Sequence, residues 1–558
     1  MKEKILIGVA WPYANGSLHL GHIAGAYLPA DIFARYHRLK GNDVLMVSGS
    51  DQHGTPISIR AEREGKPPQA IVDHYHQEFL DCWEKLGISF DLFTTTGTPN
   101  HREVVHDILR TLLDKGYVYP GAMPLPHCPT CRRFLADRYV EGTCPNCGFP
   151  QARGDQCEQC GKPLNPDELL EPRCSLCGTR PEIRESKHLF LRLSAFEERL
   201  KEWVGQQTHW RPNVFSLTNR YLKEGLRDRA ITRDIEWGIP VPVSGFEQKR
   251  IYVWFEAVIG YLSASKEWAK LSGDEERWRD FWQGEAKTYY FIGKDNIPFH
   301  TIIWPAILMG YGGLNLPYDV PANEFLTLEG RPLSTSRGWA IWLPDFLERY
   351  EPDALRYFLS AGMPETGDAD FSWREFLRRV NDELVATYGN LVHRVLSFTY
   401  RNFDGVIPSP GELDARDNEL LARAEETLHQ VDELLSDCHF REGIRVAFGL
   451  AQEANRYLDE KAPWKSIKEE RGAAETAVAV CLGAISCLKT ILLPYLPFSS
   501  LKLHRLLGLD GKPEEGGWRF SFPLKGKLSG PPEPLFSKLP EEIVAQEMAR
   551  LHGAEGES

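Results

Sequence analysis

The 558-residue chain has no long apolar run and no excess of basic side chains. Its longest apolar stretch, "TAVAVCLGAISCL" at 476–488, is too short to cross a bilayer and is followed by a lysine. The 65 basic and 78 acidic side chains leave a net charge of −13, which argues against a protein that coats nucleic acid indiscriminately. We therefore expect no membrane span, while a local basic surface stays open.

The first residues lack the features of a secretory leader. "MKEKILIGVAW" begins with charge, but its apolar run is short and leads into "PYANG" without a small-residue cleavage site. With 42 % apolar and 26 % charged residues, the composition is that of an ordinary globular protein. We expect a cytoplasmic chain of roughly three or four domains. No internal repeat is visible in the sequence.

Cysteine is concentrated in one segment of the chain. Eight of the twelve cysteines form four C-x-x-C pairs between residues 128 and 177. Each pair offers two thiolates at the spacing that tetrahedral zinc needs, and the Gly- and Pro-rich loops between them are too poor in apolar residues to hold their shape without metal. The alternative, disulfides of a secreted domain, lacks any sign of export. The predicted ligands are Cys128, Cys131, Cys144, Cys147, Cys157, Cys160, Cys174 and Cys177.

The order of these pairs predicts two nested zinc sites. The second and third pairs are the nearest neighbours, so we expect them to share one ion and to leave the first and fourth pairs to share the other. Four thiolates fill a structural site, so both zinc ions are predicted to be structural.

The N-terminal part reads as alternating strands and helices. "KILIGVA" at 4–10 and "DVLMVSGSD" at 43–51 look like buried parallel strands, with an amphipathic helix between them that ends at Gly41. "RIYVWFEA" at 250–257 and "KTYYFIGKD" at 287–295 are predicted to be further strands. The pattern predicts a doubly wound, parallel, Rossmann-like sheet into which the cysteine-rich segment is inserted.

From about residue 376 the apolar positions follow helical spacing, as at 380–395, 421–435 and 444–458, which predicts an all-α bundle. The residues after it are rich in turn formers and are expected to pack back over the body. The predicted plan is a catalytic sheet in two halves (1–115 and 231–322), a zinc-knuckle insertion (116–230), a loop and linker region (323–375), a helical domain (376–540) and a tail (541–558).

The segment "NGSLHLGHIAG" at 15–25 sets two histidines three residues apart after the first strand. A helix that starts at the carboxyl edge of such a sheet offers free N–H groups to anions. At this spacing both imidazoles point to one side, where they can donate to phosphate oxygens, and Gly21 lets a flat base approach the backbone. We therefore predict that His19 and His22 bind a nucleotide; a metal-binding pair or an inert surface pair are the alternatives.

Several dispersed motifs together indicate a family. "PYANGSLHLGH" resembles the HIGH signature of class I aminoacyl-tRNA synthetases, and the match continues through "GSDQHGTPI", "YVWFEAVIGY" and "FIGKDNIPFHTIIWPA". With the C-x-x-C insertion, the chain resembles the methionyl-tRNA synthetases over nearly its whole length. Relatives that activate isoleucine, valine or leucine carry a much larger editing insertion.

The resemblance implies an enzyme that activates L-methionine with ATP and transfers it to tRNA(Met), with Mg²⁺ accompanying ATP. A duplicated relative that activates another amino acid, or binds tRNA without charging it, is the alternative. By the same resemblance, His19, Gly21, His22, Lys294 and Asp295 would bind ATP, with Lys294 near phosphate and Asp295 on the ribose.

The implied methionine pocket is aromatic, which suits a polarizable thioether, although any one of these aromatics could be plain core. Asp51 would lie near the amino group. Two departures stand out: Trp11 replaces an expected leucine, and Ser50 stands where some members have a second aspartate. The implied pocket residues are Trp11, Tyr13, Asp51, Trp254, Ala257, Tyr261 and His300.

The segment "EGRPLSTSRG" at 329–338 lies where related synthetases have a mobile KMSKS loop, whose lysines act on the departing pyrophosphate. Aligned on Ser334 and Ser336, this chain has Pro332 and Thr335 in place of both lysines. Arg331 could supply the missing charge, although the neighbouring proline restricts its backbone. We expect a working but slow enzyme that uses Arg331, Ser334 and Ser336.

In the helical domain, Asn390 and Arg394 share one helix face, and Pro463 and Trp464 stand at the end of another helix in "EKAPWKS". An aromatic platform beside hydrogen-bond donors suits splayed single-stranded bases, and the family uses these positions for the CAU anticodon. A surface ion pair at Arg394 and a core role for Trp464 are the alternatives. We see no appended dimerisation module and expect a monomer.

Overall fold

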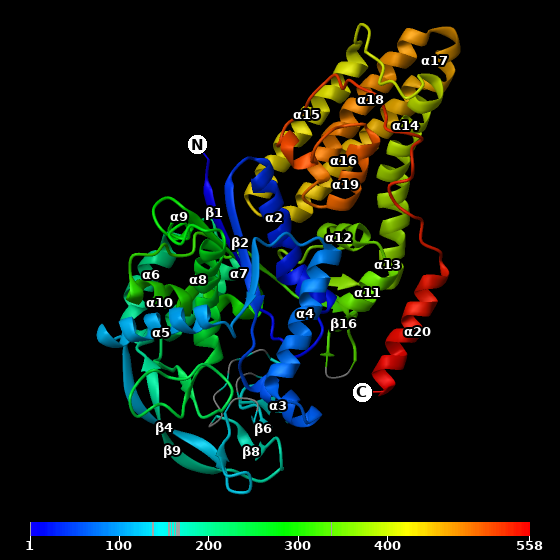
Figure 1. Cartoon of the computed structure of the whole chain (residues 1–558). Coiled ribbons are helices and arrows are strands. Elements are labelled where there is room, and N and C mark those ends of the chain that lie inside the picture. The colour runs from blue at the N-terminus through cyan, green and yellow to red at the C-terminus, as the bar shows by residue number, and fades with distance from the viewer. Residues whose placement is uncertain are drawn as a thin grey trace.

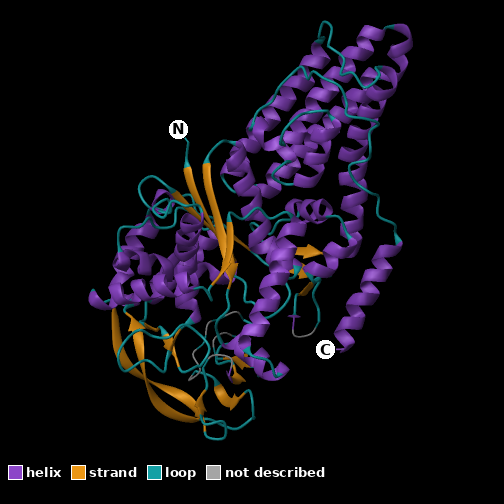
Figure 2. Ribbon diagram, in the orientation of Figure 1, coloured by secondary structure: helices purple, strands orange, loops and turns teal. Residues whose placement is uncertain are grey.

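The computed structural model describes residues 2–136, 139–154, 157, 159–160, 162, 164, 168–335 and 338–557. Figures 1 and 2 show an α/β body, a strand-rich module below it and an elongated helical bundle above it. The chain finishes in α20 (Glu542–Glu557), which lies well away from the tip of the bundle. The three expected bodies are therefore present.

The α/β body is built on a five-stranded parallel sheet of order β14-β13-β1-β2-β3, in which β1 is central and pairs with β13 and β2. Side chains alternate across β1: Ile5, Ile7 and Val9 face one apolar core and Leu6 faces the other. Both faces are thus covered, which explains the nearly continuous apolar runs that predicted these strands. The strands are β1 (Lys4–Val9), β2 (Asp43–Ser50), β3 (Leu92–Thr95), β13 (Lys287–Gly293) and β14 (Ala322–Asn323).

Helices cover each face of this sheet. The first core includes α2 and α4, and the second includes α5, α8 and α10. The helices of the body are α1 (Leu20–His22), α2 (Leu28–Leu39), α3 (Thr55–Glu64), α4 (Pro68–Leu86), α5 (Pro99–Asp114), α8 (Val253–Leu271), α9 (Arg279–Trp282) and α10 (Trp304–Tyr311). Short π and 3-10 segments join them: η1 (Ile23–Tyr27), η4 (Lys294–Asn296) and η5 (Phe299–Ile303).

The predicted strand "RIYVWFEA" is wrong for most of its length. Only β12 (Arg250–Ile251) is extended, and it pairs with β11 (Thr232–Arg233), outside the parallel sheet. Val253 begins α8, which is buried over most of its surface and therefore shows no polar face in the sequence. A short apolar run does not distinguish such a helix from a buried strand.

The insertion is more extensive than its cysteine knuckles. The long antiparallel pair of β4 and β9 extends from the body in a four-stranded sheet of order β10-β9-β4-β5, and a three-stranded sheet of order β7-β6-β8 lies beyond it. Its elements are β4 (Val118–Cys128), β5 (Arg133–Phe134), β6 (Val140–Thr143), β7 (Ala152–Arg153), β8 (Leu170–Cys174), β9 (Glu182–Leu191), η3 (Leu193–Phe196), α6 (Glu197–Gly205), α7 (Pro212–Glu224) and β10 (Arg229–Ala230).

A small three-stranded sheet of order β16-β15-β17 follows the catalytic sheet and carries the KMSKS-like segment. Arg356 of α12 ties this region to its neighbours, because its fully buried guanidinium pairs with Asp31 at 2.7 Å and donates to the carbonyl of Tyr495 at 2.7 Å. The elements here are β15 (Leu326–Leu328), β16 (Arg331–Pro332), α11 (Leu343–Arg349), α12 (Pro352–Ala361), β17 (Ala369–Phe371) and α13 (Trp373–Arg378).

The predicted helical bundle is confirmed, and its apolar positions lie inside, except that Leu421 is half-buried beside the core residue Leu420. The helix α18 is longer than the apolar run at 476–488 that predicted it, and by length and composition alone it could span a membrane. However, 83 % of its most apolar window is buried inside the protein. The elements are η7 (Arg379–Gly389), α14 (Asn390–Asn402), α15 (Ala415–Ser436), α16 (Phe440–Lys461), α17 (Pro463–Glu469), α18 (Arg471–Leu492), α19 (Pro497–Leu506) and η8 (Pro513–Gly516).

The chain end differs from the expected turn-rich tail because α20 is a helix. It packs back on the body, where Glu547 accepts hydrogen bonds from Arg349 at 2.9 Å and from the Tyr350 hydroxyl at 2.9 Å. Ile543 and Leu551 are buried in this contact. Isolated apolar residues among charges gave too weak a period for the sequence to reveal this helix.

Candidate active site and tRNA-binding surface

The segments that follow β1 and β2 are joined at the carboxyl edge of the sheet. The backbone N–H of Asp51 donates to the carbonyl of Pro12 at 2.7 Å, and that of Ala14 donates to Asp51 at 2.9 Å. The Trp11 ring lies between Gly49 and Gly260, and a methyl group at Gly260 would be 2.7 Å from the indole. Two glycines therefore make the room that the larger residue at this position needs.

His19 and His22 stand at the start of α1, as predicted, with His19 as the N-cap. Nδ1 of His19 accepts from the Gly21 backbone at 3.1 Å, and Nδ1 of His22 accepts from the His19 backbone at 3.1 Å. With Nδ1 accepting, the proton of each neutral ring lies on Nε2. Burial lowers the pKa of His22 to about 4, and burial together with His22 lowers the pKa of His19 well below its usual value. The stacked pair, with centroids 3.8 Å apart, thus presents two neutral N–H donors.

The space above Gly21 is taken by the KMSKS-like segment. A methyl group on Gly21 would lie 2.7 Å from Cδ1 of Leu333. The chain beyond it runs beside the signature, since Leu20 donates to the Ile341 carbonyl at 3.2 Å and Leu343 donates to Leu18 at 2.7 Å. Glycine at this position therefore permits close approach by Leu333 in this arrangement.

The KMSKS-like segment holds its arginine against an aromatic ring. The Arg331 guanidinium lies 3.8 Å from the centroid of Trp339, which in turn lies 5.8 Å from the ring of His552 in α20. Ser334 pairs with Trp339 through two backbone hydrogen bonds of 2.9 Å. The predicted residue Ser336 lies outside the described residues.

Four predicted pocket residues come together between α8 and η5. The Tyr261 hydroxyl lies 2.8 Å from Nε2 of His300, whose Nδ1 donates to the Asn296 carbonyl at 2.9 Å. Burial lowers the pKa of His300 to about 4, so the ring is neutral and Nε2 accepts from Tyr261. Trp254 stacks on Phe299 with centroids 4.0 Å apart, and Ala257 lies on the following turn of α8. Tyr13 pairs through its backbone with Asp51.

Asp51 is buried within a group of charged side chains that sequence reasoning missed. His53 lies 2.9 Å from Glu256, and His101 approaches the same carboxylate at 3.4 Å. His53 and Glu256 stand inside the quoted motifs "DQHGTPI" and "YVWFEAVIGY", which was the signal available. Ser50, at the position of the expected second acid, bonds to Nδ1 of His76 at 2.8 Å.

The two residues after β13 that were predicted to bind ATP, Lys294 and Asp295, differ in their surroundings. The Lys294 ammonium is bonded to Glu324 at 2.7 Å and to Asp368 at 2.8 Å. Against the effect of burial, Asp368 and Glu324 raise its pKa, so the charge is retained. Asp295 accepts from the Asn296 amide at 3.3 Å and is exposed at the end of the strand.

The cysteines form two groups with the predicted nesting. Cys128, Cys131, Cys174 and Cys177 make one group, the remaining two pairs make the other, and within each group all sulfurs lie within 4.8 Å of one another. The sulfur–sulfur distances of 3.5 Å between Cys128 and Cys177 and 3.6 Å between Cys147 and Cys157 are close to the ~3.8 Å expected between sulfurs that share tetrahedral zinc. Both groups therefore fit a structural zinc ion.

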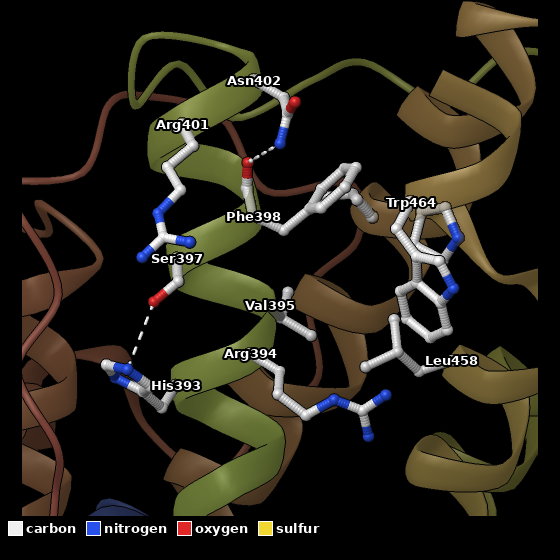
Figure 3. A pocket seen from close by; sticks show the side chains of 11 residues that line it. His393, Arg394, Val395, Ser397, Phe398, Arg401, Asn402, Leu458 and Trp464 are labelled. Carbon is white, nitrogen blue, oxygen red and sulfur yellow. Dashed lines mark hydrogen bonds between the residues drawn. The ribbon is translucent and has the colours of Figure 1, made fainter. Parts of the chain in front are cut away.

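The bundle brings together three of its four predicted residues. A pocket of about 400 Å³ is lined by Arg394, Pro463 and Trp464, and Figure 3 shows Phe398 pointing across it toward Trp464. The Arg394 guanidinium lies 5.3 Å from the indole centroid and also pairs with Asp459 at 2.6 Å. Asn390 is exposed one helical turn away and does not line the pocket. Arg401 and Asn402, which do line it, were not predicted.

Comparisons with known proteins identify the family of both the α/β body and the bundle. Residues 5–396 match the family model of class I tRNA synthetases (M), and residues 407–556 match that of the anticodon binding domain of methionyl tRNA ligase. Methionine–tRNA ligase of Dehalococcoides mccartyi is 58 % identical over 551 residues, which cover 99 % of this chain and 100 % of the relative. The enzyme of Thermomicrobium roseum is 53 % identical over 579 residues, which cover 99 % of both chains.

Among solved structures, the Mycobacterium tuberculosis methionyl-tRNA synthetase in complex with methionyl-adenylate superposes with a TM-score of 0.80 at 26 % identity, covering 96 % of this chain and 100 % of that one. The match therefore extends over the sheet, the insertion and the bundle together. With both family models and near-complete relatives in agreement, the chain belongs to the methionine–tRNA ligases, a family of class I aminoacyl-tRNA synthetases.

Proposed function

We propose that the carboxyl edge of the sheet joins L-methionine to ATP and then transfers the aminoacyl group to tRNA(Met). A methionine carboxylate oxygen attacks the α-phosphorus, and pyrophosphate leaves with the broken bond's electrons. The terminal ribose hydroxyl of the tRNA then attacks the carbonyl carbon of the adenylate, the bond from that carbon to the phosphate oxygen breaks, AMP leaves with its electrons, and the hydroxyl proton is released. The observation that carries this proposal is the pair of neutral imidazoles whose Nε2–H groups are fixed by backbone bonds at the start of α1. The protein supplies position and charge and forms no covalent intermediate.

In this proposal His19 and His22 donate to phosphate oxygens of ATP, and Asp295 accepts from the ribose. Lys294 exchanges its contacts with Glu324 and Asp368 for phosphate. Gly21 receives the base once Leu333 moves aside. Arg331 and the serines of the KMSKS-like segment, Ser334 and Ser336, support the departing pyrophosphate.

The methionine side chain is proposed to enter between Trp254 and the Tyr261–His300 pair, with Tyr13 and Ala257 beside it. Aromatic rings favour a thioether through sulfur–aromatic contact. Trp11 narrows the end of this space, because its ring already fills the gap between two glycines. Asp51 accepts from the ammonium group.

We propose that zinc has a structural role and that Mg²⁺ acts with ATP. Two zinc ions hold the two cysteine groups and supply folding energy to a segment with little apolar core. Mg²⁺ enters with ATP, where it balances phosphate charge.

The bundle is proposed to read the anticodon loop of tRNA(Met). Trp464 supplies a stacking surface beside the Arg394 guanidinium, Pro463 begins α17 under it, and Asn390 extends the same helix face. We propose that the protein is a cytoplasmic monomer.

The test is ATP–pyrophosphate exchange against a panel of amino acids, followed by charging of tRNA(Met). We expect exchange with methionine alone, and then charging. Exchange with a different amino acid, or tRNA binding without exchange, would instead support the duplicated relative. The identity with named methionine–tRNA ligases, up to 59 % over 551 residues, favours the first outcome.

A further inference from the structure

A cluster of buried titratable groups adjoins the proposed amine contact. Asp51 is 3 % exposed and Glu256 is fully buried. Nδ1 of His53 lies 2.9 Å from Oε1 and 3.1 Å from Oε2 of Glu256. From α5, Nε2 of His101 lies 3.4 Å from the same carboxylate, and its Nδ1 bonds to the Ser263 hydroxyl at 2.8 Å.

The same imidazole is also linked to Asp51. The backbone N–H of His53 donates to Oδ1 of Asp51 at 3.2 Å. The Thr96 hydroxyl lies 3.5 Å from that oxygen and 3.5 Å from Nδ1 of His53. Asp51 and Glu256 are thus both buried and both bonded to His53. Two neighbouring buried carboxylates disfavour each other's ionisation, unless a cation lies with them.

We propose that His53, held as an imidazolium by Glu256, neutralises that carboxylate and thereby keeps Asp51 ionised to receive the ammonium group of the amino acid. His53 and Glu256 touch neither methionine nor ATP in this proposal, so they are positioning residues. The inference rests on the proposed function in one respect, the contact between Asp51 and the amine.

Within the cluster, the charges of Glu256 and His53 shift the pKa of Asp51 in opposite directions. Burial and the charge of Glu256 raise the pKa of Asp51 well above its ordinary value, and the charge of His53 opposes that rise. Although burial lowers it, Glu256 raises the pKa of His53. The other titratable groups packed against the cluster are His101 from α5 and Glu267 of α8, which accepts from the Thr94 hydroxyl at 3.0 Å.

The inference predicts that a double variant is less impaired than one of its single variants. His53→Gln removes the imidazolium that faces Glu256 and leaves His101, 3.4 Å from the same carboxylate, as the remaining imidazole there. The pKa of Asp51 therefore rises further, and a smaller fraction of Asp51 is ionised. We expect the KM for methionine to rise about tenfold at pH 7 and to recover toward pH 9, because a shift of one to three pKa units is typical of a charge at this range. His53→Gln/Glu256→Gln removes both charges and should restore the KM to within about threefold of the parent.

The measurement is methionine-dependent ATP–pyrophosphate exchange between pH 6 and pH 9, with KM and kcat separated. His76→Gln is the matched control: it removes an imidazole bonded to Ser50, the residue before Asp51, and should leave the pH profile unchanged. A merely structural role for His53 predicts the opposite pattern, in which the double variant is worse than either single one.

Additive losses in the double variant, or an unchanged KM and pH profile in His53→Gln, would overturn the inference. If His53→Gln does not fold, Glu256→Gln alone decides: we expect a KM within about threefold of the parent, and an upward shift of its pH profile would contradict us. Asp51→Asn separates the two levels. An unchanged KM for methionine in Asp51→Asn would refute the contact between Asp51 and the amine. A raised KM in Asp51→Asn, together with an unchanged KM in His53→Gln, would refute only the role of His53 and Glu256.

Discussion

The sheet edge and the pocket of the bundle differ in how firmly their side chains are held. At the sheet edge, each signature imidazole accepts a backbone hydrogen bond of 3.1 Å, and His300 is fixed on both ring nitrogens. In the bundle, Trp464 is 41 % exposed, and Arg394 is held by Asp459, which is itself on the surface. The side chains of the proposed ATP and methionine site are thus held in place by hydrogen bonds, whereas the proposed anticodon site is an exposed surface.

This difference has a kinetic consequence. Adenylate formation depends on groups aimed at developing charge, so small errors at the sheet edge are costly. Anticodon binding depends on stacking and desolvation at an exposed surface, where single contacts contribute less. Changes at the sheet edge should therefore depress both partial reactions, and changes in the bundle should depress only tRNA charging.

The largest effect is expected for Arg331→Ala. Loss of one preorganised donor to a transition state typically lowers the rate about 10²–10³-fold. We expect such a fall in kcat of pyrophosphate exchange, with little change in the KM for methionine, because Arg331 lies on the KMSKS-like segment and not among the pocket residues. Pro332→Lys should raise the rate, since it restores an ammonium group. Normal exchange in both variants would show that this segment is not the catalytic element.

Trp464→Ala should produce the next largest effect, on tRNA charging and not on pyrophosphate exchange. Loss of one stacking partner costs about 1–3 kcal/mol, so the kcat/KM of charging should fall while exchange stays nearly intact. Trp464→Phe should recover much of the loss. Phe498→Ala, which removes an equally exposed aromatic side chain of the same bundle, is the control. Equal losses in exchange and charging would mean that Trp464 is structural.

Loss of one zinc ion should disturb the order of the sheet edge through α3. The zinc module contacts this helix through Tyr139 and Arg133, which bond to Glu62 at 3.1 Å and 3.0 Å, and α3 directly follows the Asp51 cluster. With Cys144→Ala we expect zinc content to fall from two ions toward one, and exchange and charging to decline together. Metal analysis by mass spectrometry and both assays test this. A folded, fully active protein with no zinc would contradict it.

The sequence predicted the elements whose signal is local. Strands β1, β2 and β13 were predicted from their apolar runs, and the order of the four cysteine pairs predicted which pairs lie together. It did not predict what depends on distant partners. The contact between His53 and Glu256 joins residues 203 positions apart, and the place of Trp11 depends on glycines in β2 and α8. For the same reason α8 was mistaken for a strand, since its buried surroundings come from other segments.

The smallest effect is expected for Asp459→Asn, and the direction of its effect on the KM for tRNA shows whether the ion pair restrains or positions Arg394. Asp459 holds the Arg394 guanidinium at 2.6 Å, and surface ion pairs of this kind contribute about 0.2–1 kcal/mol. Freeing Arg394 beside Trp464, and removing one negative charge from a surface proposed to meet tRNA, should lower the KM for tRNA up to about fivefold at low salt and less at high salt. Exchange should not change. Glu460→Gln is the matched control, because it removes one charge from the same helix but leaves the Arg394 pair intact; Arg416 loses this partner and keeps Glu419 and Glu453. If both variants lower the KM equally, the gain comes from general charge, and the pair with Asp459 has no separate role. If Asp459→Asn raises the KM, the ion pair positions Arg394 for the anticodon. The side chains of the bundle surface would then be preorganised, as those of the sheet edge are.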